Sequence, residues 1–253
     1  IDNAVDEFIM GFGSTIEIRL DDGRVEVRDY GRGIPLGKIV DCVSTINTGA
    51  KYNDDVFQFS VGLNGVGTKA VNALSREFLV RSYRDGRFAE ARFARGTLQE
   101  QKQGRDADAR DGTFVAFTPD PEIFGKSTYR EPHVLRRLRF YAWLNAGLTL
   151  RYNGQSIASE NGLRDLIAEE TDGEQLYPPF HFRDTLLELA LVHTNRFSED
   201  YFSFVNGQFT ADGGTHLSAF REGVLKAVNE FAKGKFDGED VREEIGRASC
   251  RER

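Results

Sequence analysis

The chain has 253 residues, of which 40% are hydrophobic, so it can bury a substantial core in one large domain or two modest ones. Its formal net charge of −7 argues against a protein that holds nucleic acid by itself, because such proteins are usually basic. The sequence has no apolar run long enough to span a bilayer, and its first residues show no signal-peptide pattern. Cys42 and Cys250 stand far apart, outside any CxxC or Cys/His pattern, which favours a reducing cytoplasm over a zinc site or a disulfide.

Residues 1–10 have the spacing of an amphipathic helix. The apolar positions are Ile1, Val5, Phe8 and Ile9. The polar side chains on the opposite arc are Asp2, Asn3, Asp6 and Glu7. Such an arc is most often a solvated face. It can also line a cation site, for which Asn3 offers an amide oxygen.

Two predicted strands, 14–20 and 25–28, form a hairpin that ends at an acidic residue, Asp29. The glycines that follow allow two interpretations. In the first, Asp29 serves only a turn, where it accepts backbone N–H bonds. In the second, its carboxylate lies on a pocket floor and accepts a hydrogen bond from an exocyclic amine, with Arg32 and Pro35 beside the base.

A second helix is predicted over 36–46, followed by a polar segment, 47–60, that is either a plain connection or a lid with Lys51 facing phosphate. Next, Gly62, Gly65 and Gly67 run into a predicted helix over 68–75. Glycines before a helix can form an ordinary turn. They can also let a polyphosphate approach main-chain N–H groups and the positive end of the helix dipole.

The remaining patterns predict alternating strands and helices. Strands are expected over 78–83, 88–95, 97–103, 111–117 and 148–152, with helices over 134–145 and from 162. The segment 171–179 is rich in turn residues and is the best internal boundary. Beyond it, strands over 186–192 and 201–205 precede a long helix that begins near Thr215. This order predicts an α+β fold in which helices cover one side of a mixed sheet, followed by a second domain.

Five motifs in this order resemble the GHKL (Bergerat) nucleotide-binding fold, and closely the B subunits of bacterial type IIA topoisomerases, gyrase and topoisomerase IV. They are 1–7 (IDNAVDE), 29–35 (DYGRGIP), 62–67 (GLNGVG), 111–113 (DGT) and 212–216 (DGGTH). The resemblance extends to about Val241. It implies a two-layer GHKL sandwich over 1–172 and the start of a ribosomal-S5-like transducer domain over 176–244. Residues 245–253 are interpreted as a non-native tail.

The resemblance implies ATP and Mg²⁺ as cofactors and gives each site residue a role. Asn3 would coordinate magnesium, and Asp29 would accept from the adenine amino group with Thr113 supporting it through a water. Glu7 would pair with Arg32, and Lys51 would reach the phosphates. Residues implied beside the adenine are Gly33, Ile34 and Pro35. Backbone donors to the triphosphate would be Gly62, Leu63, Asn64, Gly65, Val66 and Gly67.

The resemblance also implies partners: DNA through the full-length protein, a breakage–reunion A subunit, and a second B subunit on ATP binding. In the family, the general-base Glu stands two residues before the position of Ile1, and a transducer Lys lies beyond Val241. The 253 residues are therefore expected to bind ATP weakly without turning it over. Asn64 stands where gyrase commonly has His, which favours a topoisomerase IV-like subunit.

Three alternatives compete with this hypothesis. The first is another GHKL branch: a heat-shock chaperone, a MutL-type mismatch-repair protein or a histidine kinase, against which residues 212–216 argue. The second is a nucleotide-sensing clamp that does not hydrolyse ATP. The third is a plain structural α+β domain, which would require five motifs to coincide by chance.

Overall fold

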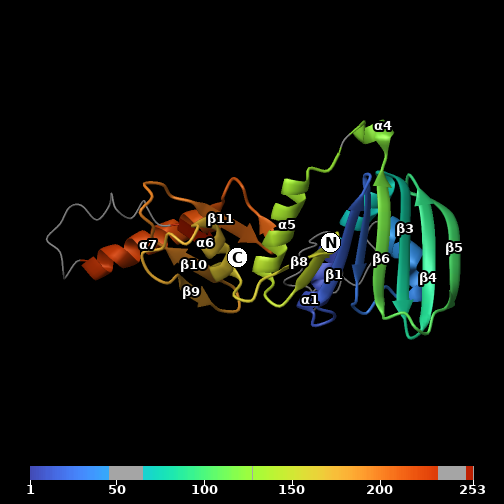
Figure 1. Cartoon of the computed structure of the whole chain (residues 1–253), viewed down its shortest axis with the longest axis horizontal. Helices are drawn as coiled ribbons and strands as arrows, with labels where there is room; N and C mark the ends of the chain where they lie inside the picture. Colours follow the sequence, from blue (N-terminus) through green and yellow to red (C-terminus); the bar gives the residue numbers. More distant parts are fainter. Residues whose placement is uncertain (46–64, 127, 233–248, 253) are drawn as a thin grey trace. The chain divides into compact units, whose positions relative to one another are not determined.

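The computed structural model describes residues 1–45, 65–126, 128–232 and 249–252, and the chain divides into two compact units, 1–159 and 160–253 (Figure 1). The predicted domain limits, 1–172, 176–244 and 245–253, stay a prediction. Within the described ranges, no helix combines the length and the hydropathy needed to cross a membrane.

The described part of the first unit forms an eight-stranded sheet in the order β5-β4-β3-β6-β2-β1-β7-β8. The strands are β1 Thr15–Asp21, β2 Arg24–Asp29, β3 Ser75–Arg84, β4 Arg87–Ala94, β5 Thr97–Arg105, β6 Gly112–Pro119, β7 Thr149–Tyr152 and β8 Gln155–Ala158. The β1–β7 pair is parallel and the other neighbours are antiparallel, so the sheet is mixed, as predicted.

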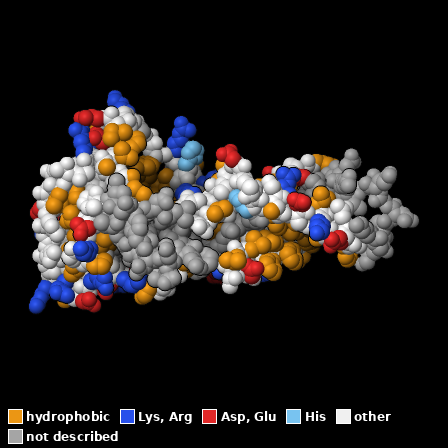
Figure 2. Space-filling view, turned by 180° about the vertical axis from the view of Figure 1, so that it is seen from behind, with side chains coloured by type: hydrophobic (Ala, Val, Ile, Leu, Met, Phe, Trp, Pro, Cys, Tyr) orange, Lys and Arg blue, Asp and Glu red, His pale blue; other side chains and the backbone are white. Residues whose placement is uncertain are grey.

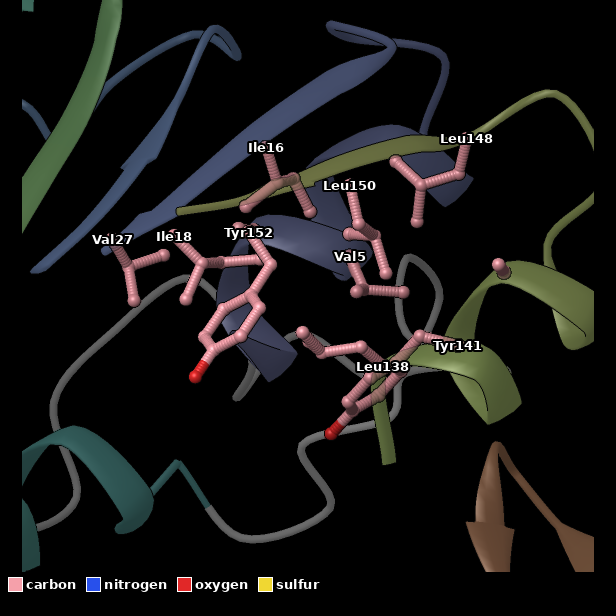
Figure 3. Close-up of a cluster of buried hydrophobic side chains, with 11 residues drawn as sticks. Val5, Ile16, Ile18, Val27, Leu138, Tyr141, Leu148, Leu150 and Tyr152 are labelled. Atoms are coloured by element: carbon pink, nitrogen blue, oxygen red, sulfur yellow. The ribbon is translucent and has the colours of Figure 1, made fainter. Parts of the chain in front are cut away.

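Helices pack against one face of this sheet. They are α1 Asp2–Ile9, the 3-10 turn η1 Leu36–Lys38, α2 Ile39–Ser44, α3 Gly67–Ala73 and α5 Glu131–Leu144. The short helix α4 Pro121–Phe124 has no buried residue. Val5 of α1 and Leu138 of α5 pack on Ile16 and Leu150 in one core (Figure 3). In a second core, α2 packs on β3 and β4 through residues that include Ile39. The expected arrangement of helices on one side of the sheet is confirmed.

Two predicted boundaries were wrong, because pairing between strands decided them. The predicted helix 68–75 ends at Ala73, since Ser75 already pairs with Pro119 in β3 and β6. The strand predicted over 97–103 extends further, because Arg105 still pairs with Arg87. The short elements β8, β9 and α4 were missed, although Asp120 followed by Pro121 is a typical helix start.

The second unit has its own sheet, with the order β12-β11-β13-β10-β9 among its described residues. Its elements are α6 Leu163–Glu170, β9 Phe180–Arg183, β10 Glu188–Val192, β11 Tyr201–Val205, β12 Gln208–Phe209, α7 Thr215–Ala232 and β13 Ser249–Glu252. Helix α6 contacts β10. Strand β13 lies between β10 and β11 in a segment where no strand was predicted. That residues 245–253 are not native stays a prediction.

Candidate nucleotide-binding site

The polar face of α1 connects two segments that are far apart in the sequence. Asn3 Nδ2 donates a hydrogen bond to Thr68 Oγ1 over 2.5 Å, at the beginning of α3. One turn later, the Glu7 carboxylate accepts from Arg32 three times: from the backbone N at 2.9 Å, from Nε at 3.1 Å and from Nη2 at 2.9 Å. Helix α1 therefore lies between the glycine-rich segment and the end of the β1–β2 hairpin. The predicted Glu7–Arg32 pair is present in the structure.

Asp29 occupies the last position of β2, and only 8% of it is exposed. Its Oδ1 accepts from the backbone N–H groups of Gly31 at 3.0 Å and Thr113 at 3.1 Å. Burial raises the pKa of the Asp29 carboxyl, and these two hydrogen bonds and the charge of Arg28 act in the opposite direction. Since both donors use Oδ1, Oδ2 is the oxygen through which Asp29 can accept from a ligand.

Tight packing fixes the chain around Asp29. Gly112 has φ +131°, and a Cβ there would lie 2.2 Å from the carbonyl oxygen of Asp29, so only glycine fits. Gly33, Ile34 and Pro35 lead from Arg32 to η1, and Ser82 Oγ donates to the Ile34 carbonyl over 2.6 Å. The hairpin end is thereby held by β3 and β6.

Beside this hairpin end there is a hollow of about 420 Å³. Its lining includes Pro35 and Leu36 from one side and Arg84 and Arg87 from the β3–β4 hairpin on the other. Of the described residues predicted to bind the nucleotide, only Pro35 lines this hollow, and Asp29 does not, so the hollow does not test the expected base pocket.

The glycine-rich end of the site differs in its packing. Gly65 has φ +57°, and a Cβ added there or at Gly67 meets no described atom within 4 Å. Val66 precedes α3, whose first residue is Gly67. Lys69 is only 6% exposed and its Nζ donates to the Gly65 carbonyl over 2.7 Å. Predicted site residues that lie outside the described part of the chain are Lys51, Gly62, Leu63 and Asn64.

Sequence reasoning missed several groups that shape the site. The contacts made by Thr68, Ser82 and Lys69, described above, were not predicted from the sequence. Lys69 could have been found, because a lysine two positions after the last glycine lies on the first turn of the helix. Thr113 was expected to support Asp29 through a water. In the structure, the backbone N–H of Thr113 also donates directly to Asp29 Oδ1.

The comparisons with known proteins agree on one family. Residues 157–247 match the family model for DNA gyrase B. The chain is 54% identical over 244 residues to the B subunit of DNA topoisomerase 4 from Borreliella burgdorferi, a match that covers 96% of this chain and 41% of that protein. It is 35% identical over 256 residues to the B subunit of DNA gyrase from Thermus thermophilus, with 92% of this chain and 40% of that protein covered.

A solved structure gives the same result for the fold. The 43K ATPase domain of Thermus thermophilus gyrase B, in complex with an aminocoumarin, superimposes with a TM-score of 0.77 at 29% identity, covering 99% of this chain and 73% of that one. The chain belongs to the family of type IIA topoisomerase B subunits. It spans about two fifths of the length of these curated B subunits, 41% and 40%.

Membership in the B-subunit family confirms the fold predicted from the five motifs, because the matched region of gyrase B is a GHKL ATPase domain. It also argues against the chaperone, mismatch-repair and histidine-kinase branches, and against a structural domain without a ligand. The solved relative is an ATPase domain, which supports nucleotide binding as a proposal for this chain. The individual roles of the site residues remain proposals.

Proposed function

We propose that this chain binds ATP for a type IIA topoisomerase, which uses ATP to pass one DNA duplex through another. The observation that carries the proposal is the position of α1. Its Asn3 bonds the first turn of α3 and its Glu7 bonds the hairpin end that holds Asp29. One helix therefore ties a segment suited to phosphates to a buried carboxylate suited to a base.

In this proposal the purine is recognised at Asp29, which accepts from the exocyclic amine through Oδ2. Arg32, held by Glu7, borders the base together with Gly33, Ile34 and Pro35. Gly65, Val66 and Gly67 offer backbone N–H groups to the phosphates, as do Gly62, Leu63 and Asn64. Lys51 supplies a cation from the preceding segment, and Thr113 supports the base through a water.

Magnesium fits the residues that are present. The described residues contain no group of three His, Cys, Asp or Glu side chains arranged for a metal. Mg²⁺ in nucleotide sites usually takes one or two protein oxygens and completes its shell with phosphates and water. Asn3 binds Thr68 through its amide nitrogen, so the amide oxygen is the atom that would hold the ion. Bound there, Mg²⁺ would neutralise phosphate charge.

For the whole protein, we propose DNA, a breakage–reunion A subunit and a second B subunit as partners, in the cytoplasm. A topoisomerase IV subtype is supported by 54% identity to the B subunit of a topoisomerase 4, against 35% for that of a gyrase. Asn64 at the position of the common gyrase His agrees with that subtype.

Base selectivity tests the proposal. A carboxylate accepts from the 6-amino group of adenine but faces the oxygen of guanine at the same position, so ATP should bind more tightly than GTP. We expect the affinities to differ at least about 30-fold, equal to about 2 kcal/mol. GTP loses a hydrogen bond to a charged acceptor and places its carbonyl oxygen against the carboxylate. Calorimetric titration of the chain with each nucleotide, with MgCl₂, measures it. Equal affinities, or no binding of either nucleotide, would contradict the proposal.

A further inference from the structure

The eight-stranded sheet has a second face, which carries alternate residues of each strand. On β1, Ile16 and Ile18 enter the core, so Glu17 between them points to the other face. On β3, Val80 belongs to the core, so the same alternation places the neighbouring Arg81 on the second face. In Figure 1, strands β3 to β6 stand in front of the helices that cover their core side. The described helices that pack on the sheet do so through its core face.

Strand register aligns cations in one row across this second face. Arg151 pairs with Glu17, Glu17 with Arg28, and Arg28 with Phe114. The row continues from Phe114 to Arg81, from Arg81 to Glu90, and from Glu90 to Lys102. The strands in this row are β7, β1, β2, β6, β3, β4 and β5, so a cation stands on every second strand: Arg151, Arg28, Arg81 and Lys102. We call these four residues the cation row.

The spacing of the cation row follows from the geometry of a sheet. Neighbouring strands lie about 4.8 Å apart, so successive cations are about 10 Å apart and the row is about 29 Å long. This length is close to one turn of B-DNA, about 34 Å. The sheet therefore presents positive charge along a line whose length matches a helical turn of a duplex.

Buried Glu90 holds part of the row in place without neutralising it. Its side chain is 1% exposed, and it accepts from Arg81 Nε at 2.5 Å, Arg92 Nε at 3.1 Å and Lys102 Nζ at 3.0 Å. Burial acts to raise the pKa of Glu90, but the hydrogen bonds from these three cations outweigh it and lower the pKa, so the carboxyl is ionised. Arg92 also pairs with Glu100 at 3.5 Å, and Arg151 pairs with Glu17 at 3.5 Å. The cation row together with Arg92 therefore holds five positive charges against the three carboxylates Glu17, Glu90 and Glu100, which leaves a net charge of +2.

Aromatic rings hold the other part of the row. The Arg28 guanidinium lies 4.4 Å from the ring centroid of Tyr83 and 4.9 Å from that of Tyr30, and Nη2 donates to the Arg110 carbonyl over 2.5 Å. Arg81 lies over Phe88 at 5.1 Å. These contacts order the guanidinium groups and leave their charge in place. Ordered cations lose less conformational entropy when they bind phosphate.

We propose that the cation row binds the phosphate backbone of duplex DNA. Charge complementarity carries the choice of partner, together with the match between the row and a helical turn. The net charge of −7 does not oppose such a local contact, because charges more than about 10 Å away are largely screened at 0.1 M salt. The surface seen from the opposite side in Figure 2 has described acidic and basic side chains interspersed. The inference goes beyond the nucleotide site and does not depend on it.

The test is the salt dependence of DNA binding by this chain. If the row makes four phosphate contacts, a plot of the logarithm of affinity against the logarithm of salt concentration should have a slope of about −3.6. A fluorescent 40-bp duplex should therefore bind about 50-fold more weakly at 150 mM than at 50 mM NaCl. In the double variant Lys102→Gln, Arg151→Gln, the slope should become shallower, about −1.8, and the same increase in salt should weaken DNA binding only about 7-fold. Both side chains are substantially exposed, 42% and 57%. Their neutralisation leaves Arg81 and Arg92 paired with Glu90 and removes the Arg151 partner of Glu17.

The matched control is Lys126→Gln, Arg139→Gln, which removes the same charge from exposed positions outside the row. It should keep the slope of the parent chain, and all three proteins should bind ATP with equal affinity, because the row lies on the other face of the sheet from Asp29. The proposal would be overturned if the slope were unchanged in the Lys102, Arg151 variant, or if the control variant changed the slope by the same amount. Tighter binding of an acidic peptide of matched charge, or of duplex RNA, would reassign the row to that partner and reject DNA.

Discussion

Glycines serve opposite purposes at the two ends of the proposed nucleotide site. At the adenine end, Gly112 and Gly33 are enclosed: an added Cβ would lie 2.2 Å from the Asp29 carbonyl oxygen in one case and 2.6 Å from the Tyr83 carbonyl oxygen in the other. At the phosphate end, Gly65 and Gly67 have no described atom within 4 Å of such a Cβ. The first pair allows two parts of the backbone to approach each other closely, whereas no described atom crowds the second pair.

The comparison extends to hydrogen bonding. Around Asp29, backbone donors, Ser82 and the Glu7–Arg32 pair hold the hairpin end before any ligand arrives. At the phosphate end, the described contacts are those of Lys69 with Gly65 and of Asn3 with Thr68. We infer that base recognition is preorganised by these contacts.

The largest expected effect separates the two kinds of glycine. Gly112→Ala should reduce the free energy of unfolding by about 3 kcal/mol or more, because it combines a forbidden φ with a backbone clash. Gly65→Ala should cost only about 1–2 kcal/mol, the penalty of a left-handed residue without a clash, and yet lower ATP affinity at least about tenfold. Urea unfolding and calorimetric titration measure both. Equal stability of the two variants would remove the distinction between enclosed and open glycines.

A smaller effect is expected at the carboxylate. Asp29→Asn keeps an oxygen for the Gly31 and Thr113 donors but loses the charge offered to the adenine amino group. ATP affinity should fall about 30-fold, equal to about 2 kcal/mol. The thermal midpoint at pH 7 should stay the same or rise, because a buried charge is removed. Unchanged affinity in a folded variant would take Asp29 out of base recognition.

How far the sequence predicts this site depends on what each residue contributes. Asp29 was singled out by its residue type and its position at a strand end, and the Glu7–Arg32 pair was implied by the family resemblance. The structure brings Glu7 and Arg32 together at the hairpin end that carries Asp29. The backbone donors at Gly31 and Thr113 could not be identified in this way, since nearly every residue has an N–H group and only the fold decides where it points.

The fold follows a similar rule. Helices and long strands were predicted from their periodicity, and the mixed sheet from their order. The end of α3 depends on pairing between Ser75 and Pro119, residues that are far apart in the sequence, so local propensity could not give it. Strand order, which sets the cation row, also lies beyond local patterns: Lys102 and Arg151 share a row only because β5 and β7 belong to one sheet.

The smallest expected effect is a pH dependence confined to the preorganised end. Burial raises the pKa of Asp29 above 3.8, so the carboxylate takes up a proton at a higher pH than in the unfolded chain. Adenosine, which has no phosphate to titrate, should therefore lose affinity as pH falls through this raised pKa. Stability has the opposite sign: the folded state binds the proton more tightly, so this group's contribution is largest below 3.8 and is lost as pH rises through the raised value.

Asp29→Asn provides the control, because it removes the titrating group and keeps the shape of the side chain. Titrations with adenosine and thermal melts between pH 4 and 7 should show both trends in the difference between the parent chain and the variant, in which the other titrating groups cancel. If the parent chain instead gained stability relative to the variant as pH rose across this window, hydrogen bonds would outweigh burial at Asp29. The carboxylate would then be stabilised in the empty site, and the adenine end would be preorganised in charge as well as in shape.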